Sequence, residues 1–476
     1  MQLNKRGNKS DMGWNTIKRS LKSSDMQKRM AIVVLLIVVY RLLSHIPIPL
    51  AEPTQLKQLI DNVFNSQQLL GFFDLLSGGA LSSLSIMLMG LGPYINASII
   101  MQLLTKAIPQ LEELQQDGEG GRRKINQWTR MIALPLAILQ SIGLLLLIRQ
   151  TAGAQLGIDI TANTSPFQWV LMIATLTGGS MLLMWIGELM TEQGIGNGIS
   201  LLIFAGIVSQ LPGTASTLIR TVEGNNQQLS VFNQFTLPIS GKGLLITTSI
   251  IAATTLVTFL VVKLNEAQRV IKVSYAKRVQ GNRAYGGVAT ILPIKLIVAG
   301  VIPIIFAVAF LSVPQFIGQL IQSNTTPWIA DLGTNLTVWF AQPGQQQSTS
   351  SNPVNTYVYP AVYFLLIVAF TFFYTSVVFN AKEIAENLQK QGGFIEKIRP
   401  GEQTELYLKK IVSRLNLFGA FSLGLLALLP LFVERILGTS SLTIGGTGLL
   451  IVVSVALETL RQLESRALMV TYDQDY

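Results

Sequence analysis

Residues 131–148, MIALPLAILQSIGLLLLI, form a stretch of 18 uncharged and mostly apolar residues that begins directly after Arg130. A hydrocarbon core about 30 Å thick needs roughly 20 helical residues to cross it. The stretch therefore predicts a membrane-spanning helix once its flanks are included. Nine further stretches of this kind occur along the chain. The ten predicted spans lie near residues 31–46, 84–104, 131–148, 169–189, 199–211, 243–262, 291–313, 358–378, 417–431 and 446–460.

Positive charge lies almost entirely in alternate gaps between these stretches. Of 35 Lys and Arg residues, 29 fall in five segments: residues 1–30 hold eight, 105–130 five, 263–295 seven, 381–416 seven, and the tail after 460 two. Loops rich in Lys and Arg stay on the cytoplasmic side of a membrane. The alternation predicts an even number of spans with both termini in the cytoplasm.

Composition favours one membrane-embedded bundle of 476 residues over several soluble domains. Only 13% of the residues are charged, and the mean hydropathy is +0.46. The chain has no cysteine, which excludes disulfides, thiolate catalysis and Cys-ligated metals. The single histidine, His45, cannot alone build a zinc site or a Ser-His-Asp triad. We expect no cofactor and no bound metal.

The net charge of +10 is concentrated on the predicted cytoplasmic face. Such a face attracts anionic lipid head groups, nucleic acid or an acidic protein. Within residues 1–30, Trp14, Ile17 and Leu21 recur at helical spacing among basic residues. They predict a cytoplasmic amphipathic helix at the interface. Arg41 interrupts the apolar run that follows, so we expect no cleavable signal.

The segment 69–86, LLGFFDLLSGGALSSLSI, is apolar but is broken by Ser77-Gly78-Gly79 and several serines. It cannot cross the bilayer in one helix together with the second span. A short re-entrant helix is one interpretation, and a helix lying flat on the membrane is the other. Irregular backbone at membrane depth persists only beside protein or a water-filled cavity. The re-entrant interpretation therefore implies a cavity on the external side.

The ten spans divide as five plus five around an external loop, as in an inverted-topology duplication. The predicted parts are an N-terminal half (31–212), an external hinge loop (213–242), a C-terminal half (243–465) and a cytoplasmic tail (466–476). A second external segment, 317–356, reads as an exposed and weakly ordered loop. The cytoplasmic loops 263–290 and 381–410 are long and basic, and loops of that length are usually functional.

Apart from Arg41, which can extend its charge outward to the interface, the interiors of the spans lack the ionisable groups that transporters and pumps usually carry. Glu188, Glu192, Glu266, Glu434 and Glu458 all fall near span ends. The run GIGNG at 194–198 superficially resembles a phosphate-binding loop, but no Lys follows it and no strand precedes it. What remains is a passive pore, closed by aliphatic side chains that block ions by dewetting.

Several motifs resemble one family closely. They are IRPGEQT at 398–404, GIGNGIS at 194–200, GEGGRRK at 118–124, YAKR at 275–278 and GPYINAS at 92–98. Their order along the chain is also that of the family they resemble, the SecY family, which is the large subunit of the bacterial protein-conducting channel. The resemblance runs from about residue 14 to 465. The resemblance implies an all-α membrane protein of ten transmembrane helices in two inverted five-helix halves. It also implies a re-entrant plug, a lateral gate facing lipid, and no enzymatic activity.

The resemblance assigns roles to individual residues in the channel. The pore ring would be Leu91, Ile95, Ile199, Ile203, Ile305 and Ile451. The plug, at 72–85, would include Phe72, Phe73, Leu76, Ser77, Gly78, Gly79 and Ser83. The lateral gate, lined by the second, third, seventh and eighth spans, would include Gln102, Ser200 and Ile297.

Two of these positions depart from the family pattern. Ile297 stands where most bacterial relatives carry Asn, and Ser83 stands where Arg is common. Gln102 is thereby left without the usual polar partner. We expect a gate closed mainly by apolar packing.

The two basic cytoplasmic loops would dock the motor ATPase SecA and the ribosome with its RNA. The residues implied are Lys272, Lys277, Arg278, Arg283, Arg399 and Glu402. Arginine pairs bidentately with phosphate or carboxylate. Further implied partners are the small subunits SecE and SecG, unfolded preproteins, signal sequences and anionic lipids. The short tail carries Asp473 and Asp475, which leaves its contact with the motor open.

The implied function is a passive conduit in the bacterial cytoplasmic membrane. It would move unfolded preproteins across the membrane and release transmembrane segments sideways into lipid. A ten-span, ion-coupled secondary transporter is one alternative, but no midplane ion site is visible. An intramembrane enzyme is another, and an accessory SecY serving few substrates is a third.

Overall fold

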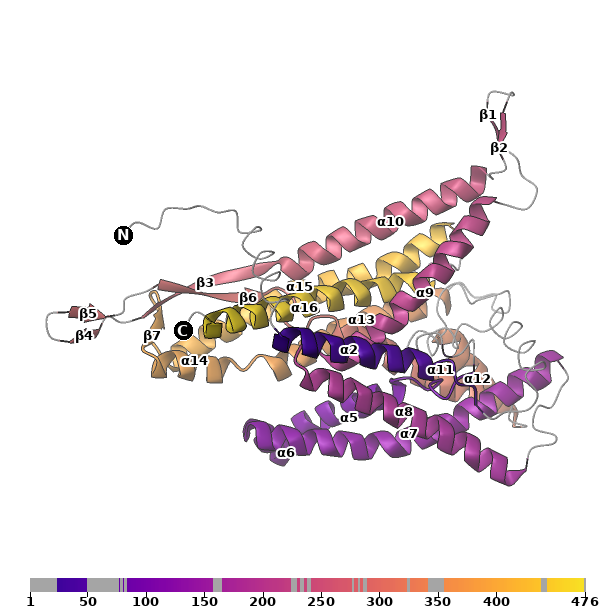
Figure 1. The fold of residues 1–476 in the computed structure, drawn as a ribbon, viewed down its shortest axis with the longest axis horizontal. Coiled ribbons are helices and arrows are strands. Elements are labelled where there is room, and N and C mark those ends of the chain that lie inside the picture. Colours follow the sequence, from indigo (N-terminus) through magenta and orange to yellow (C-terminus); the bar gives the residue numbers. More distant parts are fainter. Residues whose placement is uncertain are drawn as a thin grey trace.

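A computed structural model gives the fold as a bundle of long helices with a small sheet projecting from one end (Figure 1). The structure describes residues 24–48, 77, 80, 84–156, 165–223, 229–231, 235–237, 241–275, 278–280, 283–285, 289–322, 326–340, 355–437 and 443–474.

The first part of the chain forms helices whose starts follow ordinary capping rules. Pro166 opens one helix behind Ser165, whose side chain accepts a hydrogen bond from the Gln168 backbone in a capping box. Pro93 and Pro109 stand in the first turns of two others. These helices are α2 (Ser24–Leu43), α5 (Gly92–Ala107), α6 (Pro109–Gln116), α7 (Glu119–Leu156), α8 (Pro166–Glu192) and α9 (Gly198–Glu223).

The second part repeats the pattern of long apolar helices. Asn380 caps one of the shorter ones through its side chain, which accepts from the Glu383 backbone. The helices are α10 (Gly241–Glu266), α11 (Ile302–Ile321), α12 (Pro327–Trp339), α13 (Asn355–Val378), α14 (Ala381–Lys390), α15 (Glu402–Leu437) and α16 (Thr443–Gln474).

The strands of the described residues form three small antiparallel sheets. One hairpin joins β1 (Leu229–Val231) to β2 (Phe235–Leu237), and another joins β4 (Arg278–Gln280) to β5 (Arg283–Tyr285). The third sheet has the order β6-β3-β7, from Ala289–Lys295, Gln268–Tyr275 and Gly393–Ile395. Figure 1 shows it at one end of the bundle of long helices, where the short helix α14 contacts β7. Both long basic loops thus contribute strands to one sheet.

Seven helices of the described residues are long and apolar enough to cross a membrane. The chain is a multi-pass membrane protein. The seven are Glu119–Arg149, Pro166–Glu192, Gly198–Arg220, Gly243–Glu266, Ile302–Ile321, Tyr357–Lys390 and Glu402–Val433. The other three predicted spans coincide with α2, α16, and α5 together with the turns before it. Ten crossings therefore stay a prediction.

The structure differs from the sequence-based expectation at four places. The seventh predicted span, 291–313, begins in strand β6, and its helix α11 starts only at Ile302. The second predicted span is not helical over residues 84–91, where Leu84 and Gly90 have positive φ and the chain makes turns. The helix α9 runs to Glu223, beyond residue 212, where we placed the end of the N-terminal half. The segment 317–356, expected to be weakly ordered, contains α12. This helix packs so closely on α11 that a Cβ on Gly318 would lie 2.9 Å from the carbonyl oxygen of Gly333.

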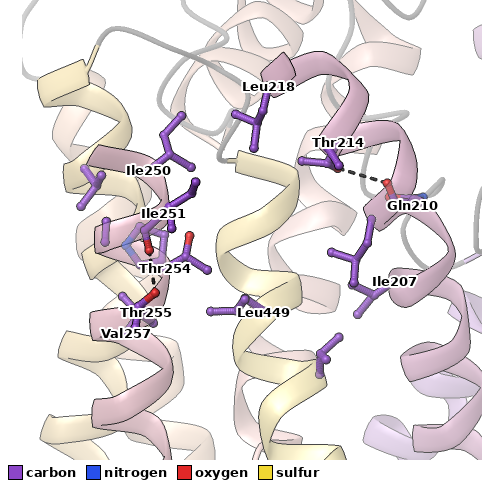
Figure 2. A pocket seen from close by; sticks show the side chains of 16 residues that line it. Ile207, Gln210, Thr214, Leu218, Ile250, Ile251, Thr254, Thr255, Val257 and Leu449 are labelled. Atoms are coloured by element: carbon purple, nitrogen blue, oxygen red, sulfur yellow. Dashed lines mark hydrogen bonds between the residues drawn. The ribbon is translucent and has the colours of Figure 1, made fainter. Parts of the chain in front are cut away.

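Helices from the two parts of the chain meet on two sides. On one side α9 contacts α10 and α16, and on the other α11 contacts α5 and α7. We call the second interface the seam. The first interface leaves an apolar cavity of about 410 Å³ (Figure 2). Its few polar groups are largely satisfied locally, since Thr214 Oγ1 donates to the Gln210 carbonyl and Thr255 Oγ1 to that of Ile251.

Candidate functional site

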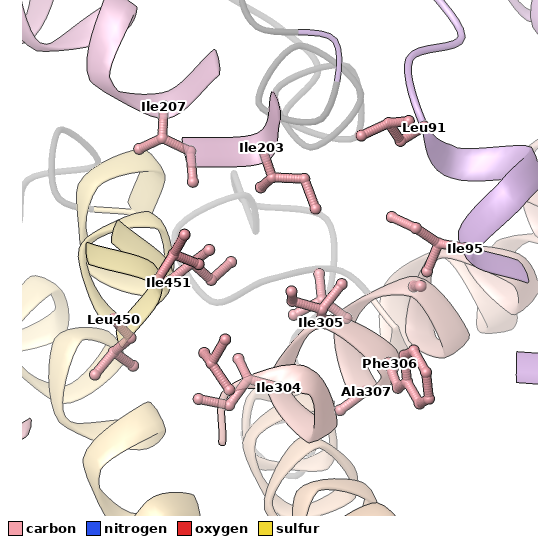
Figure 3. Close-up of a cluster of buried hydrophobic side chains, with 14 of the residues drawn as sticks. Leu91, Ile95, Ile203, Ile207, Ile304, Ile305, Phe306, Ala307, Leu450 and Ile451 are labelled. Atoms are coloured by element: carbon pink, nitrogen blue, oxygen red, sulfur yellow. The ribbon is translucent and has the colours of Figure 1, made fainter. Parts of the chain in front are cut away.

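The six residues assigned to the pore ring come together at the centre of the bundle. Five of them are buried in one hydrophobic cluster, and Ile199 is partly buried against it. Figure 3 shows Leu91, Ile95, Ile203, Ile305 and Ile451 projecting from different helices toward a common space. Four elements thus meet there: α5 with its preceding turn, α9, α11 and α16.

Local backbone geometry explains how α9 presents its two isoleucines. Residues 194–197 of the GIGNGIS motif form the tight turn between α8 and α9, with Gly194 and Gly196 at positive φ, and its last three residues begin α9. Thr191 Oγ1 accepts from the Gly198 backbone at 2.9 Å, and Asn197 Oδ1 accepts from that of Ile199 at 3.1 Å. A motif that superficially resembles a phosphate loop is therefore a helix-to-helix turn.

The chemistry of the ring is uniform, since every member is aliphatic. Such side chains offer no hydrogen bond and no charge to a hydrated ion, and a narrow apolar constriction expels water. They also present no specific partner to an extended polypeptide. Sequence reasoning omitted Ile207 and Ile304, which lie in the same cluster (Figure 3). The spacing of Ile207, one helical turn after Ile203, could have indicated it.

Most of the plug residues lie outside the described residues: Phe72, Phe73, Leu76, Gly78, Gly79 and Ser83. Ser77 is described, is fully buried, and accepts a hydrogen bond at its carbonyl oxygen from the Tyr40 hydroxyl of α2 at 2.7 Å. The chain after it is fixed to the end of α2. The backbone N–H of Ile48 donates to the Leu84 carbonyl, and Ser85 Oγ donates to the Leu43 carbonyl.

The gate residues occupy different places around the cluster. Gln102 on α5 donates through Nε2 to Ser98 Oγ at 3.1 Å, while its buried Oε1 has no partner among the described residues. Ser200 is buried at the start of α9. Ile297, before α11, is 5% exposed, and its Cγ1 lies 3.6 Å from where a Cβ on Gly419 of α15 would stand.

The docking residues that the structure describes lie in the three-stranded sheet, in the turn that follows β7 and in the separate hairpin of β4 and β5. Strand β3 pairs with β7, with Val273 opposite Ile395, so the two basic loops form one platform. Ile271 and Val273 face inward in a cluster with Leu408 of α15, while Lys272 is exposed.

The turn between β7 and α15 presents Arg399 and Glu402, both exposed. Thr404 Oγ1 donates to the Arg399 carbonyl at 2.9 Å. Positive φ angles at Lys397 and Gly401 make the turn tight. Arg278 and Arg283 lie in the hairpin of β4 and β5, and Lys277 lies outside the described residues.

One cation at the end of β6 was not singled out from the sequence. Burial, followed by the nearby positive charge of Arg461, lowers the pKa of Lys295, while Glu458 opposes this shift. Arg461 itself donates to the Asn265 carbonyl at 2.9 Å. Only the folded chain brings these groups from β6, α10 and α16 together. Within the described residues, no group of acidic or histidine side chains is arranged to hold a metal.

The fold and the ring define a class: a helical multi-pass membrane protein in which aliphatic side chains from two sets of helices meet in one buried cluster. The SecY family model matches residues 85–460. The protein translocase subunit SecY of Mycobacterium tuberculosis is 37% identical over 95% of this chain and 98% of its own. That of Streptomyces galbus is 38% identical over 96% and 98%. The chain belongs to the SecY family.

Solved structures agree at the level of the fold. A structure of a protein-conducting channel superposes with a TM-score of 0.63 at 20% identity, covering 91% of this chain and 90% of that one. The canine Sec61 of a ribosome-channel complex from the endoplasmic reticulum gives 0.58 at 18% identity, covering 91% and 90%.

Proposed function

We propose that this protein is the central channel-forming subunit of a Sec translocon. It conducts unfolded preproteins across the cytoplasmic membrane of a bacterium and releases transmembrane segments sideways into lipid. The observation that carries the proposal is the aliphatic ring, built by four helical elements and free of charge. Membership of the SecY family supports it.

The channel has ten spans in two inverted halves, with both termini in the cytoplasm. The distribution of Lys and Arg supports this orientation, since the sheet of β6, β3 and β7 then lies on the cytoplasmic side. The interface of α9 with α10 and α16 is the hinge, and the seam is the lateral gate.

Opening proceeds from the cytoplasmic side. A hydrophobic signal sequence enters the seam and partitions toward lipid, because each apolar residue gains free energy on leaving water. The plug around Ser77 leaves the external funnel, and the chain threads the ring. The subunit hydrolyses nothing itself, so the driving energy comes from SecA, from the translating ribosome or from the membrane potential.

The cytoplasmic platform binds SecA or the ribosome, which deliver the preprotein to the channel. Lys272, Arg278, Arg283 and Arg399 supply positive charge for an acidic motor surface or for ribosomal RNA. Solved ribosome-bound relatives of the fold support the second use. SecE and SecG complete the complex, and anionic lipids surround it.

Site-specific photocrosslinking tests the proposal. A probe at Ile305 or Ile203, in the full complex with a stalled secretory chain, should crosslink to that chain. A probe at Leu365 of α13, which is 64% exposed, should crosslink to lipid only. Equal crosslinking from Leu365 and from the ring, or none from the ring, would contradict the proposal. Solute uptake driven by an ion gradient would favour a transporter instead.

A further inference from the structure

The seam contains one unusually close contact between the two parts of the chain. Phe316 of α11 points its ring tip at Gly143 of α7. A Cβ on Gly143 would overlap Cζ of Phe316 and would lie 2.6 Å from Cε1. The Phe316 side chain is 8% exposed. The ring therefore fits only because residue 143 has no side chain.

A glycine at this position makes helix α7 less stable, and the local structure of the helix does not compensate for this. Gly143 lies in the interior of α7, where glycine is less favourable than alanine by about 0.5–1 kcal/mol. Small residues at helix interfaces in membranes let neighbouring groups approach closely. The compensating interaction available to Gly143 is the ring of Phe316 from the opposite side of the seam.

Each of the two helices is held firmly to its own side. On α7, Leu144 and Leu147 pack with residues of α8, and Ser141 lies within hydrogen-bond distance of Thr177. On α11, the rings of Phe306 and Phe310 pack edge-on against Phe370 of α13, at 5.9 and 6.0 Å. Parting the seam would therefore move two well-anchored bodies and separate Phe316 from Gly143.

Two glutamine side chains lie one helical turn from this contact, and in the part of the chain that the structure describes neither uses its carbonyl oxygen to join the two sides. Gln140 lies one turn before Gly143, and Gln319 one turn after Phe316. The Oε1 atoms of both are buried without a hydrogen-bond partner among the described residues. Gln140 Oε1 lies 3.9 Å from where a Cβ on Gly92 of α5 would stand, on its own side of the seam. Among the described residues, these two acceptors therefore add no hydrogen bond across the seam.

We propose that Phe316 seated on Gly143 is a latch that sets how hydrophobic a signal sequence must be to open the lateral gate. The proposal rests on the channel function proposed above. An entering segment must lift the ring from the glycine, and its own apolar surface replaces the lost packing. A weaker fit between the two residues lowers the required hydrophobicity.

The test makes the side chain at position 316 smaller and the side chain at position 143 larger, first singly and then together. Phe316→Leu removes the ring tip, and Gly143→Ala adds a methyl group where that tip lies. Each single variant should raise export of a reporter with a weakly hydrophobic signal about tenfold, which is about 1.4 kcal/mol at 25 °C. The double variant Gly143→Ala/Phe316→Leu should return close to the level of the unmodified channel, because the methyl group fills the space the ring vacates.

A matched pair within one side provides the control. A Cβ on Gly424 of α15 would lie 2.7 Å from Cδ2 of Phe364 on α13, and α13 and α15 belong to the same part of the chain. Gly424→Ala and Phe364→Leu should leave the signal threshold unchanged. Misfolding cannot imitate the expected result, because loss of folded channel reduces export.

The possible outcomes distinguish failure of the latch proposal from failure of the proposed channel function. If the unmodified complex exports a strong signal but neither single variant gains weak-signal export, the latch is wrong and the channel stands. Additive gains in the double variant, or equal gains from the control pair, also refute the latch. If the unmodified complex exports nothing, both proposals fail.

Discussion

The hydroxyl of Tyr40 on α2 donates a hydrogen bond of 2.7 Å to the carbonyl oxygen of Ser77. Tyr40 is 1% exposed and Ser77 is fully buried. The bond joins the first long helix to the segment we propose as the plug. A typical intramolecular hydrogen bond contributes about 0.5–1.5 kcal/mol to stability. We therefore expect this hydroxyl to help hold the segment proposed as the plug.

Replacing Tyr40 with Phe should loosen the plug. The variant removes the donor and keeps the ring, so the Ser77 carbonyl loses this bond and the closed state weakens by about 1 kcal/mol. Export of weak-signal reporters should rise several-fold. Tyr363→Phe is the control, since the buried Tyr363 hydroxyl has no partner among the described residues. A rise in both variants, or in neither, would contradict the role of the bond.

A polar residue at position 297 should make the gate easier to open. Ile297 is 5% exposed, so Ile297→Asn buries an amide in the closed state that water can reach once the gate opens. We expect the hydrophobicity threshold for signal sequences to fall, while Ile297→Leu leaves it in place. An unchanged threshold for Ile297→Asn would remove the idea of a gate closed by apolar packing.

Removing the charge of Arg399 should impair motor-driven export without harming the fold. Arg399 is exposed, and its backbone carbonyl, not its side chain, accepts from Thr404. Arg399→Ala should lower SecA-dependent translocation at least about tenfold, the scale of a lost charge-assisted hydrogen bond. Lys390→Ala on the nearby α14 should have little effect. Equal losses in the two variants would indicate a general electrostatic role.

Neutralising Lys295 should stabilise the protein. The lowered pKa means that the charged amine is less favourable in the folded than in the unfolded chain. Because the unfolded chain then binds more protons, this group's contribution to stability rises with pH up to the unfolded pKa of about 10.4. Lys295→Met should raise the melting temperature slightly at neutral pH, and the difference should shrink toward pH of about 10. A melting temperature that falls would refute this.

The sequence predicted features that depend on local composition. Most long helices fall where apolar stretches are long, because burial of the backbone in hydrocarbon leaves few alternatives to a helix. The pairing of Val273 with Ile395 could not be predicted, because it joins segments far apart in the chain. The same holds for Phe316 on Gly143, where each residue looks ordinary in its own helix. The helix α12 was missed because its short, mixed sequence resembles a loop.

Motif resemblance identified the ring residues in the sequence. Only the fold shows that they converge in one cluster. Periodicity alone does not distinguish Ile203 from other buried isoleucines such as Ile367. What distinguishes the ring residues is that four elements aim them at one point (Figure 3). That arrangement depends on turns such as the one at Gly194 and Gly196, which have positive φ angles. Glycine in the sequence permits such angles but does not determine them.

In the proposed channel, an aliphatic constriction seals the resting membrane. Chloride efflux from vesicles that contain the complete complex measures this seal, with Ile203→Asn and Ile305→Asn compared with Ile367→Asn. Ile367 is fully buried in the same cluster but lies outside the ring. We predict rapid efflux from both ring variants and tight vesicles from the unmodified complex and from Ile367→Asn. Ring variants as tight as the unmodified complex would contradict the account.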